Sequence, residues 1–257
     1  MKDHTPKHTP VVRCGSMWLK RDDHYRIAGI CGGKVRACWH LATRQRYAGL
    51  ITASARQSPQ AQIVARLAAK LGIPARLHMP TGAHTPEMRD VLAHGGEIIQ
   101  HKAGYNNVLI CRANYDCDQR PGWCPIPFGM DHPAAMQCTR GEVKSLAPYR
   151  KVVRRVVVPV GSGMTLAGVL WGLDDLNWTP PVLGVVVGAD PTKRLDHHAP
   201  PFWRQRHGLR LVPAGVPYHT HVAADIGGVG LDPVYEAKCV PYLRDGDLFW
   251  IVGKRCV

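Results

Sequence analysis

One stretch of the chain joins a buried strand to a glycine-rich turn and the start of a helix. Residues 152–153 and 156–160 are nearly all valine, which is typical of a strand buried in a parallel sheet. The turn that follows consists of Gly161, Ser162, Gly163, Met164 and Thr165. Such a corner aims backbone N–H groups and the positive end of a helix dipole at one point, which favours a phosphate group. Glycines at such corners often provide only steric relief, so a phosphate site needs a second element.

Lys34 is the second residue whose position suggests chemistry. It follows Gly32 and Gly33, and it begins a helix predicted over residues 35–42, next to apolar Ile30. A helix N-terminus and apolar surroundings both disfavour an ammonium ion, so they lower the pKa of a lysine. A lowered pKa is what a Schiff-base lysine needs. The alternative is a surface lysine at a helix start.

Composition sets the broad class of the protein. A chain of 257 residues with 45% hydrophobic residues can bury a substantial core in one large domain or two modest ones. No apolar run reaches the length of a membrane span, and the first ten residues lack the apolar core of a signal peptide. We therefore expect a soluble, cytoplasmic protein. Nine irregularly spaced cysteines indicate reduced thiols rather than a disulfide framework.

The net charge is high. Thirty-three Lys and Arg residues against nineteen Asp and Glu residues give +14, and the excess recurs along the chain. A positive net charge of this size attracts polyanions strongly, so it favours a nucleic acid contact. The alternative is a basic surface that only aids solubility.

Strand and helix patterns alternate twice along the chain. The first alternation covers residues 46–130 and predicts a small open α/β unit. The second starts at residue 152, has its next strand at 183–188, and closes with a helix over 234–243 and a strand over 248–252. Residues 1–13 are expected to form a flexible arm. Residues 190–222, rich in Pro, His and Arg, are interpreted as a long loop that reaches the ligand.

Five segments then recur in the order of one known family. They are KRDD (20–23) with GGKVRA (32–37), RQSPQ (56–60), IPFGM (126–130), PVGSGMTLAG (159–168) and LDPVYEAK (231–238). Together they resemble the pyridoxal-phosphate enzymes of the tryptophan-synthase β type, also called fold type II. Within that group the chain is most similar to the 1-aminocyclopropane-1-carboxylate deaminase and D-cysteine desulfhydrase branch.

The resemblance implies a role for each matching residue. Lys34 would form the Schiff base with pyridoxal 5'-phosphate and then act as the proton-shuttling base. The turn of residues 161–165 would hold the phosphate. Glu236 would face the pyridine nitrogen, where a carboxylate favours the protonated ring and so the stronger electron sink. Tyr235 would approach the substrate.

The resemblance also implies a carboxylate-binding loop, in which this sequence departs from the family. Gln57, Ser58 and Gln60 would bind the substrate carboxylate or the ring oxygen of the cofactor. The family usually has Asn directly after the serine, and here the residue is Pro59, which has neither an N–H nor a side-chain amide. The chain is also shorter than family members usually are, which puts family-like deamination in doubt but leaves cofactor binding intact.

The fold that the resemblance implies is α/β with two open domains and the cofactor in the cleft between them. Residues 1–45 and 131–257 would form the large cofactor-binding domain, and residues 46–130 the small one. The family also implies a homodimer.

Other clusters carry weaker signals. His219 and His221 would share one face of a strand and could form a metal pair, but no further ligand is nearby in sequence, so no metal site is predicted. Cys117 and Cys124 have little zinc-site character. Four tryptophans could include a base-stacking residue, although packing is the default for Trp: Trp171, Trp178, Trp203 and Trp250.

Three hypotheses for the function follow. The first is a pyridoxal-phosphate lyase that decarboxylates or otherwise processes an amino-acid adduct on a DNA nucleobase, because compact similar proteins occur in bacteriophages that hypermodify their DNA; this would place the protein in the host cytoplasm. The +14 charge and the altered carboxylate loop favour this hypothesis. The second is a deaminase or desulfhydrase of a free small amino acid. The third is a catalytically inactive DNA-binding homologue.

Overall fold

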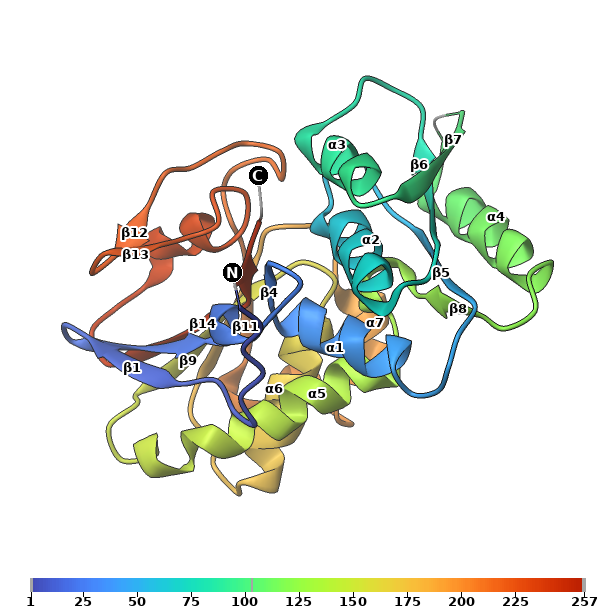
Figure 1. The fold of residues 1–257 in the computed structure, drawn as a ribbon. Helices are drawn as coiled ribbons and strands as arrows, with labels where there is room; N and C mark the ends of the chain where they lie inside the picture. Colours follow the sequence, from blue (N-terminus) through green and yellow to red (C-terminus); the bar gives the residue numbers. More distant parts are fainter. Residues whose placement is uncertain (1, 103, 256–257) are drawn as a thin grey trace.

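The computed structural model describes residues 2–102 and 104–255, which form two mainly parallel sheets lying side by side (Figure 1). The larger sheet has six strands in the order β1-β2-β14-β9-β10-β11. Their bounds are Val11–Cys14 (β1), Met17–Arg21 (β2), Asp247–Ile251 (β14), Arg155–Val160 (β9), Val182–Val186 (β10) and Arg210–Pro213 (β11). All neighbouring strands are parallel except β1 and β2. Both ends of the chain therefore contribute to one sheet.

The smaller sheet has four parallel strands in the order β7-β6-β5-β8. Their bounds are Gly96–His101 (β7), Ala75–Pro80 (β6), Gly49–Ala53 (β5) and Trp123–Ile126 (β8). Helices α2 (Pro59–Leu71) and α3 (Pro86–Ala93) lie on one face of this sheet, and α4 (Asn106–Asp118) lies on the other (Figure 1).

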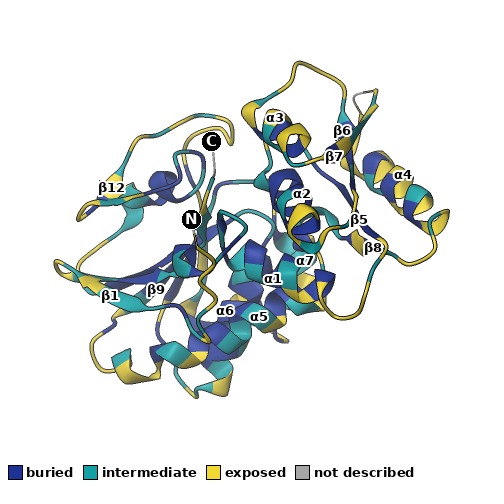
Figure 2. Cartoon of the chain, in the orientation of Figure 1, coloured by how far each residue is buried: buried dark blue, intermediate teal, exposed yellow. Residues whose placement is uncertain are grey.

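Three helices connect the larger sheet to the smaller one. Helix α6 (Met164–Asp175) packs against α5 (Pro133–Val143), and α1 (Gly33–Ala42) packs against both α5 and α2. Helix α6 is apolar almost all round, as a helix enclosed by the core must be, and most of its residues are buried (Figure 2). The start of α1 is thereby held between the two sheets.

The remaining elements are short. A three-stranded sheet has the order β15-β4-β3, with bounds Gly253–Lys254 (β15), Ile30–Gly32 (β4) and Arg26–Ile27 (β3). Strands β12 (Asp225–Ile226) and β13 (Val229–Gly230) form a hairpin, and α7 spans Thr192–His198. The 3₁₀ helices span Asp22–His24, Phe128–Met130, Lys144–Tyr149, Trp203–Gly208 and Glu236–Tyr242.

The α/β fold predicted from the sequence is confirmed, and the four strands of the smaller sheet all fall between residues 49 and 126. The domain boundaries at 45/46 and 130/131 stay a prediction. Within the described part of the chain, none of the helices combines the length and apolarity that crossing a bilayer requires.

The prediction of a flexible arm at residues 1–13 is wrong for residues 9–13, and residue 1 lies outside the described residues. Thr9 is buried, and residues 11–14 pair with β2. The Thr9 side chain donates a hydrogen bond to Asp22 (2.7 Å), and its backbone N–H donates one to Glu142 (3.0 Å). Buried polar groups must be paired, so these long-range contacts, absent from any local pattern, fix the segment.

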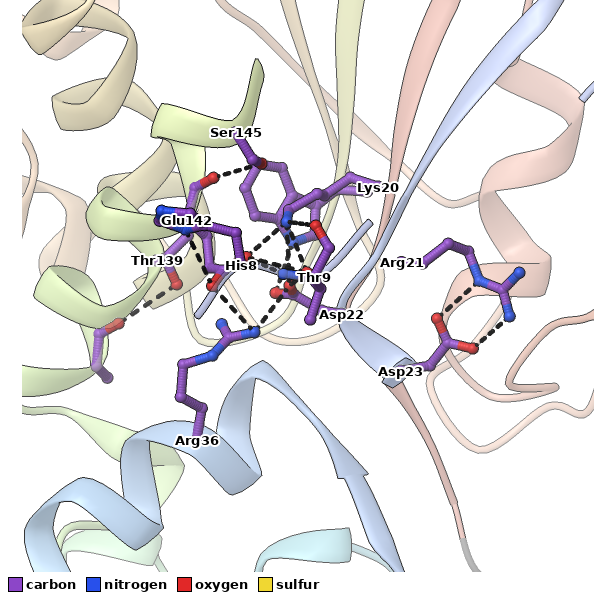
Figure 3. Close-up of polar contacts among 12 residues, drawn as sticks. His8, Thr9, Lys20, Arg21, Asp22, Asp23, Arg36, Thr139, Glu142 and Ser145 are labelled. Carbon is purple, nitrogen blue, oxygen red and sulfur yellow. Dashed lines mark hydrogen bonds and ion pairs between the residues drawn. The ribbon is translucent and has the colours of Figure 1, made fainter. Parts of the chain in front are cut away.

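A buried ionic cluster surrounds Thr9 (Figure 3). Lys20 Nζ lies 2.5 Å from Glu142 Oε2, and Arg36 Nη2 lies 3.2 Å from Asp22 Oδ1. Burial lowers the pKa of Lys20, while the charges of Asp22 and Glu142 oppose the shift. Two cations thus balance two carboxylates in the core, which is the arrangement that makes buried charges tolerable.

Three further local predictions are corrected. Residues 152–153 form a turn rather than a strand, because the Val153 N–H bonds to Tyr149 O and Val152 is exposed. Residues 190–222 are not one long loop: they contain α7, the 3₁₀ helix Trp203–Gly208 and β11, short elements between prolines. The helix expected over 234–243 is the 3₁₀ helix Glu236–Tyr242, which contains Pro241.

Candidate active site

Lys34 is the second residue of α1, at the start of the helix. Within residues 2–102 and 104–255, Nζ takes part in neither a hydrogen bond nor an ion pair. Burial is the main cause that lowers the pKa of Lys34, and the guanidinium groups of Arg255 and Arg194 lower it further. The amine is therefore shifted towards its neutral, nucleophilic form, as the sequence predicts.

The backbone just before Lys34 is fixed by the end of the chain. The Gly33 N–H donates to Val252 O over 2.8 Å, and β4 pairs with β15 through Gly32 and Gly253. A Cβ on Gly32 would collide with the Val252 carbonyl, and Gly32 has a φ of 116°. Only glycine permits this close approach and this backbone angle.

Glu236 also binds the segment of residues 252–253. Its Oε1 accepts hydrogen bonds from the N–H groups of Val252 and Gly253, both at 3.0 Å. Its Oε2 is buried and has no hydrogen-bond partner within the described part of the chain. Burial is the main cause that raises the pKa of Glu236 well above its ordinary value, and the charge of Asp232 adds to the shift. One carboxyl oxygen is thus left to bind a group that can share a proton.

Tyr235 connects Glu236 to the glycine turn. Its phenol oxygen lies directly against Gly161, where a Cβ would collide with it. Burial is the main cause that raises the pKa of Tyr235 well above its ordinary value, so the phenol keeps its proton. Gly188, after β10, approaches from the other side: a Cβ there would lie 3.1 Å from the Gly161 Cα.

The glycine turn itself ends β9 and begins α6. Gly163 precedes the helix with a φ of 89°, and the N-terminus of α6 has no side-chain cap. The N–H groups of the first turn of α6 lack intrahelical partners by geometry. A strand, a turn of small residues and an uncapped helix start have the geometry that suits an anion, and phosphate binding there stays a prediction.

The predicted carboxylate loop lies at the end of β5. Ser58 caps α2 by accepting a hydrogen bond from the Gln60 N–H (3.3 Å), and Pro59 occupies the first helical position. Proline suits that position because the N–H there needs no helical partner, which accounts for Pro59 structurally. Gln57 is exposed, and its carbonyl accepts a 2.5 Å hydrogen bond from Arg255 Nη1.

Gln60 points into the smaller sheet. Its Nε2 donates to Thr52 Oγ1 (3.0 Å) and to Pro127 O (2.7 Å), while its Oε1 is buried without a hydrogen-bond partner among the described residues. The amide thus links the end of β5 to the segment after β8. A role for Gln60 in binding substrate stays a prediction.

The structure brings Lys34, Glu236, Tyr235 and the glycine turn together through the contacts above. Arg255 and Arg194 were not predicted from the sequence. Arg255 also binds Asp232 (3.3 Å) and Glu87 (3.3 Å), so it links α3 to the segment that precedes the 3₁₀ helix Glu236–Tyr242. No spacing pattern marks these arginines, because their partners are remote in sequence.

The weaker clusters do not form sites. His219 and His221 are exposed in an irregular segment, not on a strand. Cys117 and Cys124 are buried, and burial raises the pKa of both thiols. Over the described ranges, no three His, Cys, Asp or Glu residues gather as a metal site would require. The indoles of three of the tryptophans donate hydrogen bonds inside the protein: Trp171 to His198, Trp203 to Asp196 and Trp250 to Asp22.

Comparison with known proteins bears directly on this site. The family model "Pyridoxal-phosphate dependent enzyme" matches residues 4–214. D-cysteine desulfhydrase of Yersinia pestis (strain Pestoides F) is 28% identical over 275 residues, covering 90% of this chain and 80% of the relative. Biosynthetic L-threonine dehydratase of Corynebacterium glutamicum is 28% identical over 194 residues, covering 69% of this chain and 43% of the relative.

The biosynthetic L-threonine dehydratase of Escherichia coli (strain K12) is 34% identical over 155 residues, covering 59% of this chain and 29% of the relative. The chain thus spans less than half the length of these two dehydratases. Among solved structures, an ACC deaminase homologue superposes with a TM-score of 0.80 and 24% identity, covering 98% of this chain and 90% of that one. The likeness confirms the predicted fold.

Proposed function

The chain belongs to the family of pyridoxal-phosphate dependent enzymes, and we propose that it is a lyase that breaks a bond at Cα of a small amino acid. Two hydrogen bonds and one packing contact support the proposal. The backbone before Lys34 binds Val252, Val252 binds Glu236, and Tyr235 lies against Gly161. These contacts bring the candidate amine, the candidate ring partner and the candidate phosphate turn into one region.

The residues present fit pyridoxal 5'-phosphate. The cofactor needs an amine, a phosphate cradle and a partner for its ring nitrogen. Lys34 offers an amine with no partner among the described residues, the turn of residues 161–165 offers an uncapped helix start, and Glu236 offers a buried, unpartnered Oε2. Unsatisfied buried polar atoms are costly, so a bound group that satisfies Oε2 would stabilise the site.

Each residue then has a defined task. When bound, the cofactor supplies an electron sink for the pair left at Cα when a substrate bond breaks. Lys34 would hold the cofactor, and once its amine is free, the lowered pKa would let it take up and return a proton at Cα. Glu236 would share a proton with the ring nitrogen through Oε2. Tyr235 keeps its phenolic proton and can donate a hydrogen bond next to Gly161.

The substrate carboxylate would bind at the start of α2. Ser58 and Gln57 lie there, at an N-terminus that favours anions. Pro59 removes one amide donor from this loop, while Arg255 adds a buried guanidinium that already binds the Gln57 carbonyl. Arg255 would therefore orient the loop against the remainder of the site.

The reaction would be of the deaminase or desulfhydrase type. The named relatives are a D-cysteine desulfhydrase and L-threonine dehydratases, all of which act on free small amino acids. One lysine base and one electron sink suffice to eliminate a β-substituent, a step that is followed by loss of ammonia. A homodimer stays a prediction, which light scattering of the purified protein tests.

A second candidate substrate is an amino acid carried on a DNA nucleobase. It is favoured by the net charge of +14 and by the altered loop at Pro59. Duplex binding that weakens steeply as salt rises would support it. A protein that binds duplex DNA but has no cofactor absorbance would instead point to an inactive DNA-binding homologue.

The experiment that tests the proposal is spectroscopic and kinetic. Purified protein with added pyridoxal 5'-phosphate should show visible absorbance that Lys34→Ala loses. The wild-type protein should turn over D-cysteine, L-threonine or 1-aminocyclopropane-1-carboxylate. A protein that stays colourless with added cofactor rejects the proposal. Cofactor binding without turnover of these free amino acids, together with salt-sensitive DNA binding, shifts the proposal to the DNA-borne substrate.

A further inference from the structure

A cavity of about 620 Å³ opens on the smaller sheet, between α4 and the strands β6 and β7 that it covers. Its volume is in the range of small-molecule sites. None of the residues that line it has a role in the site described above. Helix α4 flanks the cavity at the outside of the molecule, where much of its surface is exposed (Figure 2).

A hydrogen-bonded relay of three side chains forms one wall. His78 Nε2 lies 2.9 Å from Asp116 Oδ2, and His78 Nδ1 lies 2.8 Å from His101 Nε2. The two imidazole rings are stacked with centroids 5.0 Å apart. His78 is buried, whereas His101 is only partly covered.

The relay determines which ring nitrogen of His78 carries a proton. Burial alone would raise the pKa of Asp116, but hydrogen bonds from Arg76, His78 and Arg120 lower it to about 2, so Asp116 is an acceptor only. His78 Nε2 must then carry a hydrogen. Burial lowers the pKa of His78, so His78 is neutral and its Nδ1 accepts a hydrogen bond.

The protons of the His101 ring follow from those of His78. Its Nε2 must donate to His78 Nδ1. Burial is the main cause that lowers the pKa of His101, and the positive charge of Arg112 adds to the shift. A neutral His101 therefore presents Nδ1 as an acceptor, and this atom has no hydrogen-bond partner within residues 2–102 and 104–255.

Arg112 supplies an uncompensated positive charge on the same cavity. It is exposed on α4, and within the described ranges it forms no ion pair. The other guanidinium of the wall, Arg76, is already neutralised by Asp116 (2.7 Å) and Glu97. An anion that enters the cavity can thus bind Arg112, which has no ion-pair partner among the residues that the structure describes.

The rest of the wall is mainly apolar. Ile99 lies on β7, and Val108 and Tyr115 lie on α4, where they are largely exposed. Exposed apolar residues around a few polar groups are the usual composition of a ligand site. The cavity combines a free cation, a free acceptor and an apolar surface.

We propose that this cavity binds a small apolar carboxylate that carries a hydrogen-bond donor next to its carboxylate, as hydroxy acids and amino acids do. The carboxylate pairs with Arg112, the donor binds His101 Nδ1, and the apolar part packs on Ile99, Val108 and Tyr115. The site is separate from the cofactor site, so it holds whether or not the proposed lyase activity is found.

The probe is 3-phenyllactate, which has a carboxylate, an adjacent hydroxyl and a phenyl group but no amine to react with the cofactor. Calorimetric titration of the full chain, loaded with pyridoxal 5'-phosphate where it takes the cofactor up, should show saturable binding. Arg112→Gln should weaken binding at least about tenfold, because a charge-assisted pair is lost. Arg89→Gln, which removes an exposed arginine of α3 outside the cavity, should leave binding unchanged.

A second measurement tests the relay without any ligand. Nitrogen-15 spectra of the imidazoles at neutral pH should show protons on Nε2 and none on Nδ1 for both His78 and His101, and saturating probe should shift the His101 Nδ1 resonance. The proposal is overturned by a protonated His101 Nδ1, by the absence of saturable binding, or by binding that Arg112→Gln leaves unchanged.

Discussion

Gly33 and Glu236 are joined through a single residue: the Val252 carbonyl accepts the Gly33 N–H, and the Val252 N–H donates to Glu236 Oε1. Gly33 immediately precedes Lys34, so the candidate Schiff-base lysine and the candidate ring partner are positioned by one residue, Val252. Residues more than 200 positions apart in sequence thus share one rigid support.

Glu236 is the proposed partner of the ring nitrogen, so its replacement should affect turnover more than cofactor binding. Glu236→Gln keeps the shape but shares a proton less readily with the ring nitrogen. Loss of one charge-assisted hydrogen bond of about 1.5–3 kcal/mol should lower kcat by roughly 10- to 100-fold. Steady-state kinetics alongside a cofactor titration measure both effects. Unchanged turnover would refute the role of Glu236.

The contact between Tyr235 and Gly161 predicts a steric effect. Gly161→Ala places a Cβ against the phenol oxygen, so Tyr235 must move and cofactor affinity should fall. Tyr235→Phe in the same chain should recover part of the affinity, because the atom that collides is removed. Equilibrium dialysis of the cofactor measures this.

Gly141→Ala is the matched control for that experiment. Gly141 lies in α5, and a Cβ there meets nothing within 4 Å. This substitution should leave cofactor affinity intact and stabilise the protein by about 0.5–1 kcal/mol. If Gly161→Ala lowered cofactor affinity no more than Gly141→Ala does, the close packing of Tyr235 on the turn would be wrong.

The pKa of Lys34 predicts how cofactor capture depends on pH. Only the neutral amine attacks the cofactor, so the capture rate should rise with pH through the pKa of Lys34. Since burial and two guanidinium groups lower that pKa, the midpoint should lie below the ordinary lysine value of 10.5. Arg194→Gln removes one positive charge and should move the midpoint upward.

Stopped-flow absorbance of the apoprotein mixed with pyridoxal 5'-phosphate across a pH series measures the midpoint. Arg204→Gln, at an exposed arginine paired with Asp196, serves as the control and should not move it. A midpoint that Arg194→Gln leaves in place, or moves downward, would contradict the electrostatic account of Lys34.

The buried ionic cluster predicts a large loss of stability when one charge is removed (Figure 3). Lys20→Met leaves Glu142 and Asp22 short of a cation in the core, which should lower the free energy of unfolding by about 3–5 kcal/mol. Adding Glu142→Leu should return part of that loss, because the uncompensated carboxylate is gone. Urea denaturation measures both.

Lys151→Met removes a lysine from an exposed turn and should change the free energy of unfolding by less than about 0.5 kcal/mol. If Lys20→Met changed the free energy of unfolding as little as this control does, the cluster would not hold the N-terminal segment to the core.

The sequence predicts the parts of this site that are local. A valine strand, the glycine turn and a helix are neighbours along the chain, so their patterns appear in one window. Glycines next to Lys34 likewise mark a backbone that approaches another segment closely. In the sequence, Pro59 indicates that the carboxylate loop lacks one hydrogen-bond donor. In the structure it occupies the first position of α2, which suits proline.

Contacts between remote residues could not be predicted in the same way. Thr9 is held by Glu142, 133 positions away, so an apparently flexible arm is ordered. Arg255 is held by Asp232 and Glu87 and binds the Gln57 carbonyl, but nothing in its own neighbourhood distinguishes it from other basic residues. Such roles depend on the tertiary fold and become visible only when the two sheets are placed together.

The attachment of the cofactor to Lys34 can be measured directly. Borohydride reduction of the protein loaded with pyridoxal 5'-phosphate makes the link to its lysine permanent, and mass spectrometry of a proteolytic digest identifies that lysine. The account predicts that the added mass is found on the peptide that contains Lys34 and on no other peptide in stoichiometric amount. Stoichiometric label on a different lysine, or an unlabelled Lys34 peptide, would contradict it.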